Sequence, residues 1–458
     1  MSLRATIITD IGFGDAGKGS IVDYLTRTEG VDLVVRFNGG SQAAHNVVAP
    51  DGRHHTFSQF GSASLAGPAR THLSRFMLVH PLYLMQEAEA LAKLGAGNVL
   101  DRTTIDEAAL IITPYQQAVN RLRELARGGN RHGSCGHGIG ETQADALTLG
   151  GDALRAGDMR QPHLAAKKLE IVRQHKLNQI ESLMADLPDL PAVRTELQTL
   201  HDDSLSAVVA DFYSHVAKQV AIVSGNALGD LLTASAHTVF EGAQGVLLDE
   251  WYGFFPYATR STTTNANALT LLAEQDYAGD IRRLGLLRAY GTRHGAGPFV
   301  TEDSRLTAQL TEPHNRHNLW QAAFRAGYPD LVALRYALEV AGPFDALVVT
   351  CLDQIIGQAS WQLATSYDYT GAPGTQPAAL GSQPCVGRIA PAKQPSLDYQ
   401  RQLTDGLDHC QPCYNLVRPG VFQASDIPAY LEQISSLLKL PIAIASAGPT
   451  ATDKWTSV

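Results

Sequence analysis

Residues 12–20 read Gly12-Phe13-Gly14-Asp15-Ala16-Gly17-Lys18-Gly19-Ser20 and follow a short apolar run at Thr6–Thr9. An amphipathic segment starts directly afterwards, at Ile21. The spacing is the G-x-x-x-x-G-K of a phosphate-binding loop that joins a strand to a helix. Glycines let backbone N–H groups approach phosphate oxygens, the helix N-terminus favours anions, and Lys18 adds a positive charge. The stretch therefore predicts a P-loop-like nucleotide site; a tight glycine turn with a surface lysine is the alternative.

The residues that follow the lysine bear on how a metal is held. The common loop has Ser or Thr directly after the lysine, where the hydroxyl binds Mg²⁺. Gly19 stands at that position and Ser20 comes one residue later. We therefore expect Gly14, Gly17, Lys18, Gly19 and Ser20 to surround the phosphates and the metal to be held in another way.

Short apolar runs rich in β-branched residues recur along the chain, with helical segments between them. These runs are Thr6–Thr9, Asp32–Phe37, Leu110–Thr113, Thr238–Glu241, Ala346–Thr350 and Pro441–Ser446. They predict an α/β chain with a large, mostly parallel central sheet flanked by helices. Residues 162–232 differ, because Lys, Glu and Gln at helical spacing predict a helical subregion of two or three amphipathic helices. Since expected strands occur near both ends, we predict a single domain over residues 1–458.

Composition excludes several classes of protein. The 458 residues carry a formal net charge of -9 and no long basic run, which disfavours nucleic acid as a partner. No stretch of about 18 apolar residues occurs, so we expect no membrane span. The five cysteines are an odd number and do not suggest a disulfide framework. We interpret Cys410 and Cys413 as free thiols in a turn rather than as a metal or redox pair, and we expect a cytoplasmic protein.

A second loop follows the run at Asp32–Phe37. It reads Asn38-Gly39-Gly40-Ser41-Gln42-Ala43-Ala44-His45 and is dense in small and amide residues. Ligands in open α/β sheets bind at the carboxyl ends of strands, which is where this loop is expected. A functional role for His45 and the role of an ordinary packed or solvated histidine are both open on this pattern.

Together the two loops resemble the adenylosuccinate synthetase family, and further segments match it in order along nearly the whole chain. The matching segments are Gly14–Gly19, Asn38–His45, Gly133–Gly140, Phe240–Asp249, Ala289–Glu302, Thr350–Asp353 and Ser446–Pro449. The resemblance implies a ligase of purine biosynthesis that uses GTP and Mg²⁺ to join aspartate to the purine monophosphate IMP. It also implies a homodimer.

The resemblance also implies residue roles. Asp15 matches the base that takes the purine N1 proton, and His45 matches the group that steadies the phosphoryl on its way from GTP to O6. Lys18 is the third expected catalytic residue, and Asp15 with the backbone of Ala44 matches the Mg²⁺ positions. The remaining matched nucleotide-binding positions are Gln42, Cys135, Gln244, Thr259, Asp353, Ser446 and Gly448, with Gln244 at the purine and Asp353 at guanine.

Several positions depart from the family pattern. Ala16 replaces a glutamate, Cys135 a threonine, and Cys351 the lysine beside Asp353. The arginine that binds the nucleotide 5′-phosphate from the neighbouring subunit is expected near Leu149 and is absent. A phosphate rarely binds without a cationic fork, so we predict that Arg260, next to Thr259, takes its place; a solvated loop arginine is the alternative.

The largest change is in the loop that binds the amino acid. Residues 320–328 read Trp320-Gln321-Ala322-Ala323-Phe324-Arg325-Ala326-Gly327-Tyr328, and only Arg325 matches one of four family arginines. A similar pattern is associated with the branch that makes 2-aminoadenylosuccinate from a deoxyguanylate. Three functions stay open: the IMP ligase, a ligase acting on GMP or dGMP with ATP or GTP, and a nucleotide-binding regulator without activity. Retention of Asp15 favours the first.

Overall fold

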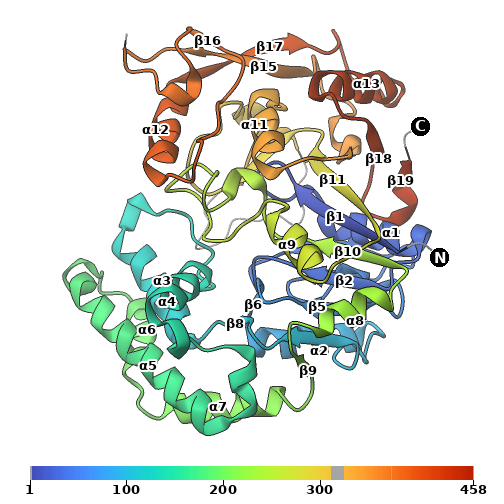
Figure 1. Ribbon diagram of the computed structural model, residues 1–458. Coiled ribbons are helices and arrows are strands. Elements are labelled where there is room, and N and C mark those ends of the chain that lie inside the picture. The colour runs from blue at the N-terminus through green and yellow to red at the C-terminus, as the bar shows by residue number, and fades with distance from the viewer. Residues whose placement is uncertain (1–2, 311–323, 373, 457–458) are drawn as a thin grey trace.

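The computed structural model describes residues 3–310, 324–372 and 374–456 (Figure 1). A ten-stranded sheet crosses the molecule in the order β19-β18-β14-β11-β1-β10-β2-β5-β7-β9. Every neighbouring pair is parallel except β18 and β19. Its strands are β1 (Arg4–Asp10), β2 (Leu33–Arg36), β5 (Arg70–Leu73), β7 (Thr103–Asp106), β9 (Ala221–Val223), β10 (His237–Glu241), β11 (Asp280–Arg288), β14 (Ala346–Thr350), β18 (Ile442–Ser446) and β19 (Lys454–Thr456). The predicted α/β fold with a mostly parallel sheet is confirmed.

Small sheets surround the large one. β12 (Gly291–His294) pairs with β13 (Phe324–Gly327). The three-stranded sheet β16-β15-β17 lies at the top of the molecule in the view of Figure 1. The other short strands are β3 (His45–Val48), β4 (His54–Phe57), β6 (Leu78–Val79), β8 (Leu110–Ile111), β15 (Gln362–Tyr369), β16 (Cys385–Val386) and β17 (Cys410–Leu416). The predicted run at Leu110–Thr113 forms β8, which pairs with β6 and lies outside the large sheet.

Helices cover both faces of the sheet and form a separate layer below it (Figure 1). Their bounds are α1 (Lys18–Glu29), α2 (Pro81–Lys93), α3 (Pro114–Ala126), α4 (Ile139–Leu149), α5 (Pro162–Ile180), α6 (Pro191–His201), α7 (Leu205–Val216), α8 (Ala227–Thr233), α9 (Ala266–Glu274), α10 (Ser304–Gln309), α11 (Leu331–Ala341), α12 (Leu397–Leu407) and α13 (Ile427–Leu438). Among these described helices, none is long and apolar enough to cross a membrane.

The helical subregion has different limits from those predicted. α3 and α4 join α5, α6 and α7 in one layer, so it begins near residue 114 and not at 162. α3 has an apolar stripe that includes Tyr115, Val119 and Leu122, and this stripe is buried in the layer. At the other end, β9 extends the large sheet and α8 packs beneath it, so the last part of 162–232 belongs to the sheet.

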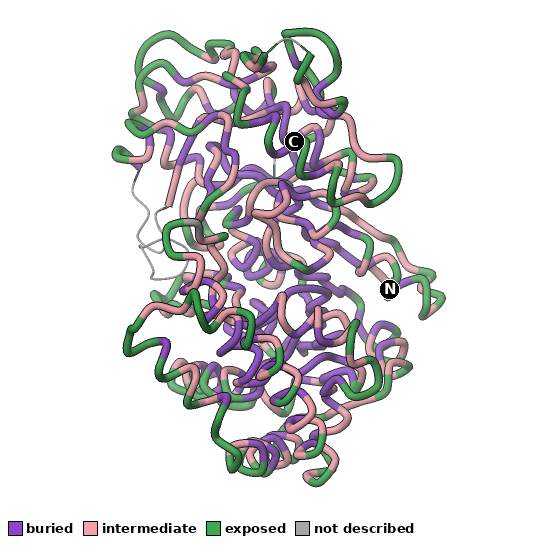
Figure 2. Tube along the Cα trace, turned by 90° about the vertical axis from the view of Figure 1, so that its left-hand side faces the viewer, coloured by how far each residue is buried: buried purple, intermediate pink, exposed green. Residues whose placement is uncertain are grey.

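The central strand β1 shows why the sheet is buried. Ile7 and Ala5 pack with the apolar faces of α8 and α9, whereas Ile8 packs with α1 on the opposite face. Alternate side chains of a strand point to opposite faces, so a strand covered by helices on both sides is buried along its length, as β1 is from Ala5 to Asp10. Figure 2 shows this buried interior along the middle of the molecule, with exposed residues on the outer loops and helices.

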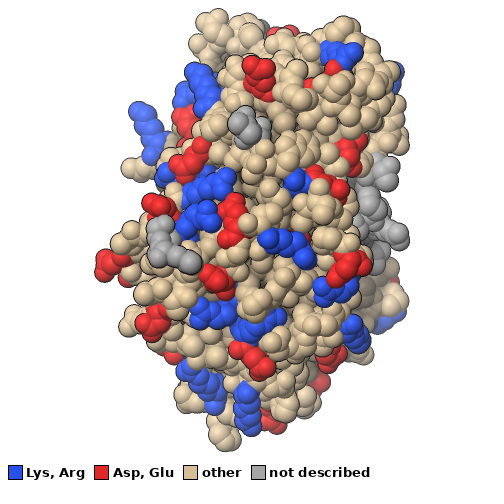
Figure 3. Space-filling view, turned by 90° about the vertical axis from the view of Figure 1, so that its right-hand side faces the viewer, with Lys and Arg blue, Asp and Glu red and all other residues tan. Residues whose placement is uncertain are grey.

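Charged groups are mixed in sign where they reach the surface. On the face in Figure 3, acidic and basic side chains lie interspersed. Arg283 and Asp345, for example, form an ion pair at 2.8 Å between the starts of neighbouring strands. Exposed pairs of this kind contribute little to stability, so the buried ones matter more.

Lys176 in the helical layer is such a buried charge. Its Nζ lies 2.6 Å from Asp145 Oδ1 and 2.7 Å from Glu141 Oε2, and the Lys176 side chain is 0% exposed. Removing one partner of a buried pair leaves a desolvated charge and costs about 3–5 kcal/mol. We expect Lys176→Met, which leaves the buried Asp145 carboxylate without this ammonium group, to lower the free energy of unfolding by that amount in urea titrations. Asp189→Ala, which breaks the exposed pair with Arg194 in the same layer, should cost about 0–1 kcal/mol, and equal losses would contradict this account.

Candidate nucleotide and catalytic site

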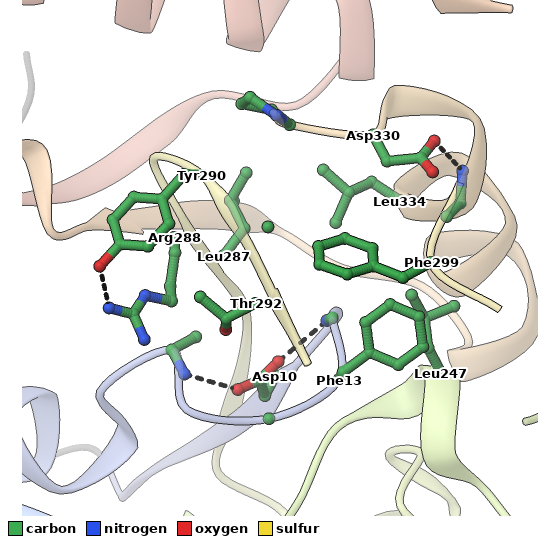
Figure 4. Close-up of a pocket in the computed structure, with 16 residues that line it drawn as sticks. Asp10, Phe13, Leu247, Leu287, Arg288, Tyr290, Thr292, Phe299, Asp330 and Leu334 are labelled. Carbon is green, nitrogen blue, oxygen red and sulfur yellow. Dashed lines mark hydrogen bonds between the residues drawn. The ribbon is translucent and has the colours of Figure 1, made fainter. Parts of the chain in front are cut away.

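The phosphate-binding loop lies between β1 and α1, as predicted, and is held by Asp10. Asp10 Oδ1 accepts from Gly12 N at 2.9 Å, and Oδ2 accepts from Ala16 N at 2.9 Å; Figure 4 shows the carboxylate inside the turn. Three residues of the loop, Gly14, Asp15 and Gly17, have φ of 101°, 62° and 80°. Glycine adopts this left-handed region without cost, which explains two of them. Gly17 is also the N-cap of α1 and has no side chain to cover the first N–H groups, so the helix N-terminus stays available to an anion.

Lys18 lies beneath this loop. Its Nζ donates to the backbone oxygen of Gln244 at 2.6 Å and to Asp10 Oδ2 at 3.2 Å, and the residue is 4% exposed. The lysine thereby ties the first loop to the loop that follows β10. Contact between Lys18 and phosphate stays a prediction; the ammonium group has three N–H donors, and the two acceptors leave one of them for a phosphate oxygen.

His45 belongs to a buried charge network that sequence patterns do not reveal. Its Nδ1 lies 2.6 Å from Glu241 Oε1, and Glu241 also accepts from the N–H and hydroxyl of Ser62. Burial lowers the pKa of the imidazole, and the charges of Arg36 and Lys18 add to this effect against the opposing charge of Glu241. A ring that faces phosphate has to donate to it, so Nε2 has to carry a proton when phosphate binds, and the carboxylate of Glu241 at Nδ1 favours that protonated form.

Gln42 and Gln244 carry amide side chains on two neighbouring loops, those that follow β2 and β10. Asn38 joins those loops, accepting from Ala243 N at 2.7 Å and donating to Ala243 O at 3.1 Å. Gln42 and Gln244 follow on the two sides of this bridge. Within the described ranges, both polar atoms of the Gln42 amide and Oε1 of Gln244 are buried without a hydrogen-bond partner. Buried polar atoms are normally paired, so these amides are the groups to which a polar ligand is expected to bind.

Asp15 projects from the phosphate loop, and its side chain is 33% exposed. Its Oδ2 lies 3.1 Å from Nε2 of His294, at the end of β12. Crowding by the protein acts to raise the pKa of the Asp15 carboxyl, but the bond and charge of His294 and the charges of Arg288 and Lys18 hold it below its ordinary value. The carboxylate is therefore ionised at neutral pH, as a base has to be.

Arg325 is engaged within the protein. It donates to Glu302 Oε2 at 2.7 Å and to the carbonyl oxygens of Gly295 at 2.7 Å and Gly297 at 3.0 Å. The structure therefore shows it holding the turn after His294, and its role toward an amino acid stays a prediction. Residues Trp320–Ala323 of the expected amino-acid loop lie outside the described residues.

The expected 5′-phosphate region is at the start of α4. Arg260 is exposed, and its stem lies across Gly140, where even a Cβ would come within 3.5 Å of Cδ. Thr259, just before it, donates its N–H to Leu248 O at 2.8 Å. Cys135 is in the loop before this helix, and burial raises the pKa of its thiol, which stays protonated. Leu149 is at the far end of α4 and packs against apolar residues of the helical layer.

Asp353 follows β14, and the Ser446–Pro449 loop follows the neighbouring strand β18. Asp353 Oδ2 accepts from Gln354 Nε2 at 2.7 Å, and Ser446 Oγ donates to Gly448 O at 3.1 Å. Lys454 donates to the carbonyl oxygen of Thr450 at 2.8 Å in the same loop. Burial lowers the pKa of this lysine to about 8, although Asp453, Asp23 and Asp353 oppose the shift. Cys351 precedes this region with φ of 58°.

A partly open cavity lies beside the phosphate loop, and Gly12, Phe13 and Gly14 of that loop line one side of it. Figure 4 shows Phe13 and Phe299 on its floor, with Leu334 above and Arg288 beside Tyr290. Phe13 and Phe299 contact edge to face, with ring centroids 5.8 Å apart. The side chains that line the cavity are mainly apolar, and they form the hydrophobic surroundings of the phosphate loop.

Among the described residues, no group of three or more His, Cys, Asp or Glu side chains could hold a metal ion. Mg²⁺ that binds together with a nucleotide commonly takes one or two protein groups and completes its coordination with phosphate oxygens and water. Asp15 and the backbone of Ala44 are the two groups expected to take part.

Comparison with known proteins covers the whole chain. Residues 7–455 match the family model of adenylosuccinate synthetase. Adenylosuccinate synthetases of Stenotrophomonas maltophilia and Xanthomonas euvesicatoria are 31% and 30% identical over 97% of this chain and 96% of their own length.

Two solved structures share the fold. The fully ligated adenylosuccinate synthetase of Plasmodium falciparum has a TM-score of 0.76 at 20% identity, with 100% of both chains covered. The succinoaminodeoxyadenylate synthetase of cyanophage S-2L, bound to dGMP and dATP, has a TM-score of 0.60 at 16% identity, covering 100% of this chain and 96% of its own. With the match of the family model across nearly every residue, the chain belongs to the adenylosuccinate synthetase family.

Proposed function

We propose that the protein is a purine nucleotide ligase that condenses L-aspartate with IMP to adenylosuccinate at the expense of GTP. The family match over residues 7–455 carries this proposal. The site supports the proposal. The loops after β1 and β2, the buried amides of Gln42 and Gln244, and the ionised Asp15 all lie at the ends of neighbouring strands of one sheet.

The proposed reaction has two steps. The Asp15 carboxylate takes the N1 proton of the 6-oxopurine while the γ-phosphoryl of GTP moves to O6, with His45 Nε2 beside the phosphoryl. The amino group of aspartate then attacks C6, and phosphate leaves with the O6 oxygen. Asp15 and the backbone of Ala44 would hold Mg²⁺, which would neutralise charge on the phosphates. Gln244 and Gln42 orient the purine nucleotide, and we propose that the active form is a homodimer.

The direct test is a substrate panel. The protein is incubated with Mg²⁺, aspartate, GTP or ATP, and one of IMP, dIMP, GMP or dGMP, and succinylated products are identified by mass spectrometry. The proposal expects product from IMP with GTP. Absence of product from every combination would favour the regulator without activity.

A second candidate has a specific observation in its favour. The cyanophage enzyme, which binds dGMP and dATP, shares this fold, and Cys351 stands where the family has a lysine beside the expected guanine site. Under this alternative the chain makes the 2-amino product from GMP or dGMP, and the panel above separates the two functions by the mass of the product.

Asp15→Asn should lower kcat by about 10²-fold or more, the usual effect of losing a general base. Affinity for the triphosphate should stay within about tenfold, because the loop backbone and Lys18 are unchanged. Steady-state kinetics and calorimetry measure the two quantities. Asp398→Asn, on the exposed surface of α12, is the matched control and should leave both unchanged. Similar kcat values for Asp15→Asn and wild type would remove Asp15 from the mechanism.

Asp353 should select guanine in the phosphoryl donor. Its carboxylate can accept two hydrogen bonds from guanine, each contributing about 1.5–3 kcal/mol, whereas adenine offers no matching pair of donors. We expect kcat/KM for GTP to exceed that for ATP by at least about tenfold in wild type, and Asp353→Asn to remove most of this preference. Equal use of ATP by wild type would contradict the assignment and support the alternative on GMP or dGMP.

Arg260→Ala should raise KM for the purine monophosphate about ten- to a hundredfold, since a charge-assisted bond to phosphate contributes about 1.5–3 kcal/mol. The position of Arg260 across Gly140, at the start of α4, motivates this. KM for the triphosphate should not change. Arg260→Lys keeps the charge without the fork and should be intermediate. An unchanged KM for the monophosphate would show that Arg260 is a solvated loop residue.

A further inference from the structure

His294 lies on the strand pair β12–β13 and contacts Asp15, the proposed base. It is the last residue of β12, and the antiparallel pairing with β13 places it opposite Phe324. From there Nε2 reaches Asp15 Oδ2 at 3.1 Å, although the two residues are far apart in the chain. The His294 side chain is 20% exposed and that of Asp15 33%, so the contact lies near the surface and not in the core.

Contacts on both sides hold the histidine in place. Its ring meets the Phe324 ring edge on, with centroids 5.1 Å apart and an interplanar angle of 62°. The turn that follows is held by Arg325, which bonds to the carbonyl oxygens of Gly295 and Gly297. Gly297 has φ of 105°, and a Cβ there would overlap Arg293. The backbone on which His294 stands is thus restrained before and after the residue.

Asp15 depends on support from outside its own loop. The other carboxylate of the loop, Asp10, is bonded by two N–H groups of the loop itself and by Lys18. Asp15 instead projects outward from a left-handed backbone position, with φ of 62°, and its carboxylate meets a group on another strand. The direction of this carboxylate is therefore set by a residue of β12 and not by its own loop.

We infer that His294 is a positioning residue for the proposed base: it donates Nε2–H to Oδ2 of Asp15 and so turns the remaining carboxylate oxygen toward the substrate. Nε2–H is present on the charged imidazole and on the neutral ring with its proton on Nε2, so the inference does not depend on the charge of His294. It rests on the proposed function, in which Asp15 takes the N1 proton. Catalysis by a base requires such alignment within hydrogen-bond reach of the proton it takes.

The experiment combines two His294 variants with the Asp15 variant. His294→Leu removes the donor and keeps an apolar side chain against Phe324, whereas His294→Gln places an amide N–H at nearly the same reach. We expect His294→Leu to lower kcat by about ten- to a hundredfold, the effect of one hydrogen bond to a charged group, with KM for the triphosphate within about twofold. His294→Gln should recover most of kcat.

A double-mutant cycle separates positioning from a general structural effect. In the Asp15→Asn background, His294→Leu should lower the residual kcat by less than about twofold, because the carboxylate it serves is already gone. His409→Leu is the matched control: this exposed histidine also meets an aromatic ring edge on, that of Tyr369, and should leave kcat unchanged. Thermal midpoints and calorimetric binding of GTP confirm that each variant is folded.

Three outcomes overturn the inference while the proposed function stands. They are an unchanged kcat in His294→Leu, no recovery of kcat in His294→Gln, and a His294→Leu loss that is as large in the Asp15→Asn background as in wild type. An inactive wild type with every substrate of the panel overturns the proposed function, and the positioning role falls with it.

Discussion

The site depends on the parallel pairing of β1 between β10 and β11. The register sets Ile8 beside Glu241 on one side and Asp10 beside Leu286 on the other. Because these strands run in the same direction, their carboxyl ends meet at one edge, where the phosphate loop and the loop after β10 both begin. A shift of one residue would turn every side chain of β1 to the opposite face and carry Asp10 away from the turn that it holds.

Buried carboxylates at these strand ends determine the electrostatics of the edge. Asp10 bonds Lys18, and Glu241 bonds His45. A charge removed from water has to be paired, so each acid fixes the position of one basic side chain.

Local patterns in the sequence predict the parts of this architecture that are made by neighbouring residues. The glycine loop, the buried strands that flank it and the loop ending at His45 follow from spacing and apolar runs. β11 does not, because its first half reads Asp-Ile-Arg-Arg and only its second half is fully buried. Glu241 and His294 act on residues far away in the chain, and no spacing rule links Glu241 to His45 or His294 to Asp15. The predicted limits of the helical layer are wrong because α3 belongs to it by packing and not by composition.

The two ends of the large sheet are both very short strands. β9 (Ala221–Val223) closes one end and β19 (Lys454–Thr456), which runs antiparallel, closes the other. An open sheet edge is a row of unpaired N–H and C=O groups on which another chain can add a strand, and short edge strands limit that reaction. A sheet of ten strands therefore presents only three residues for such addition at each end. Addition of a strand from another chain at either edge of the large sheet is therefore disfavoured.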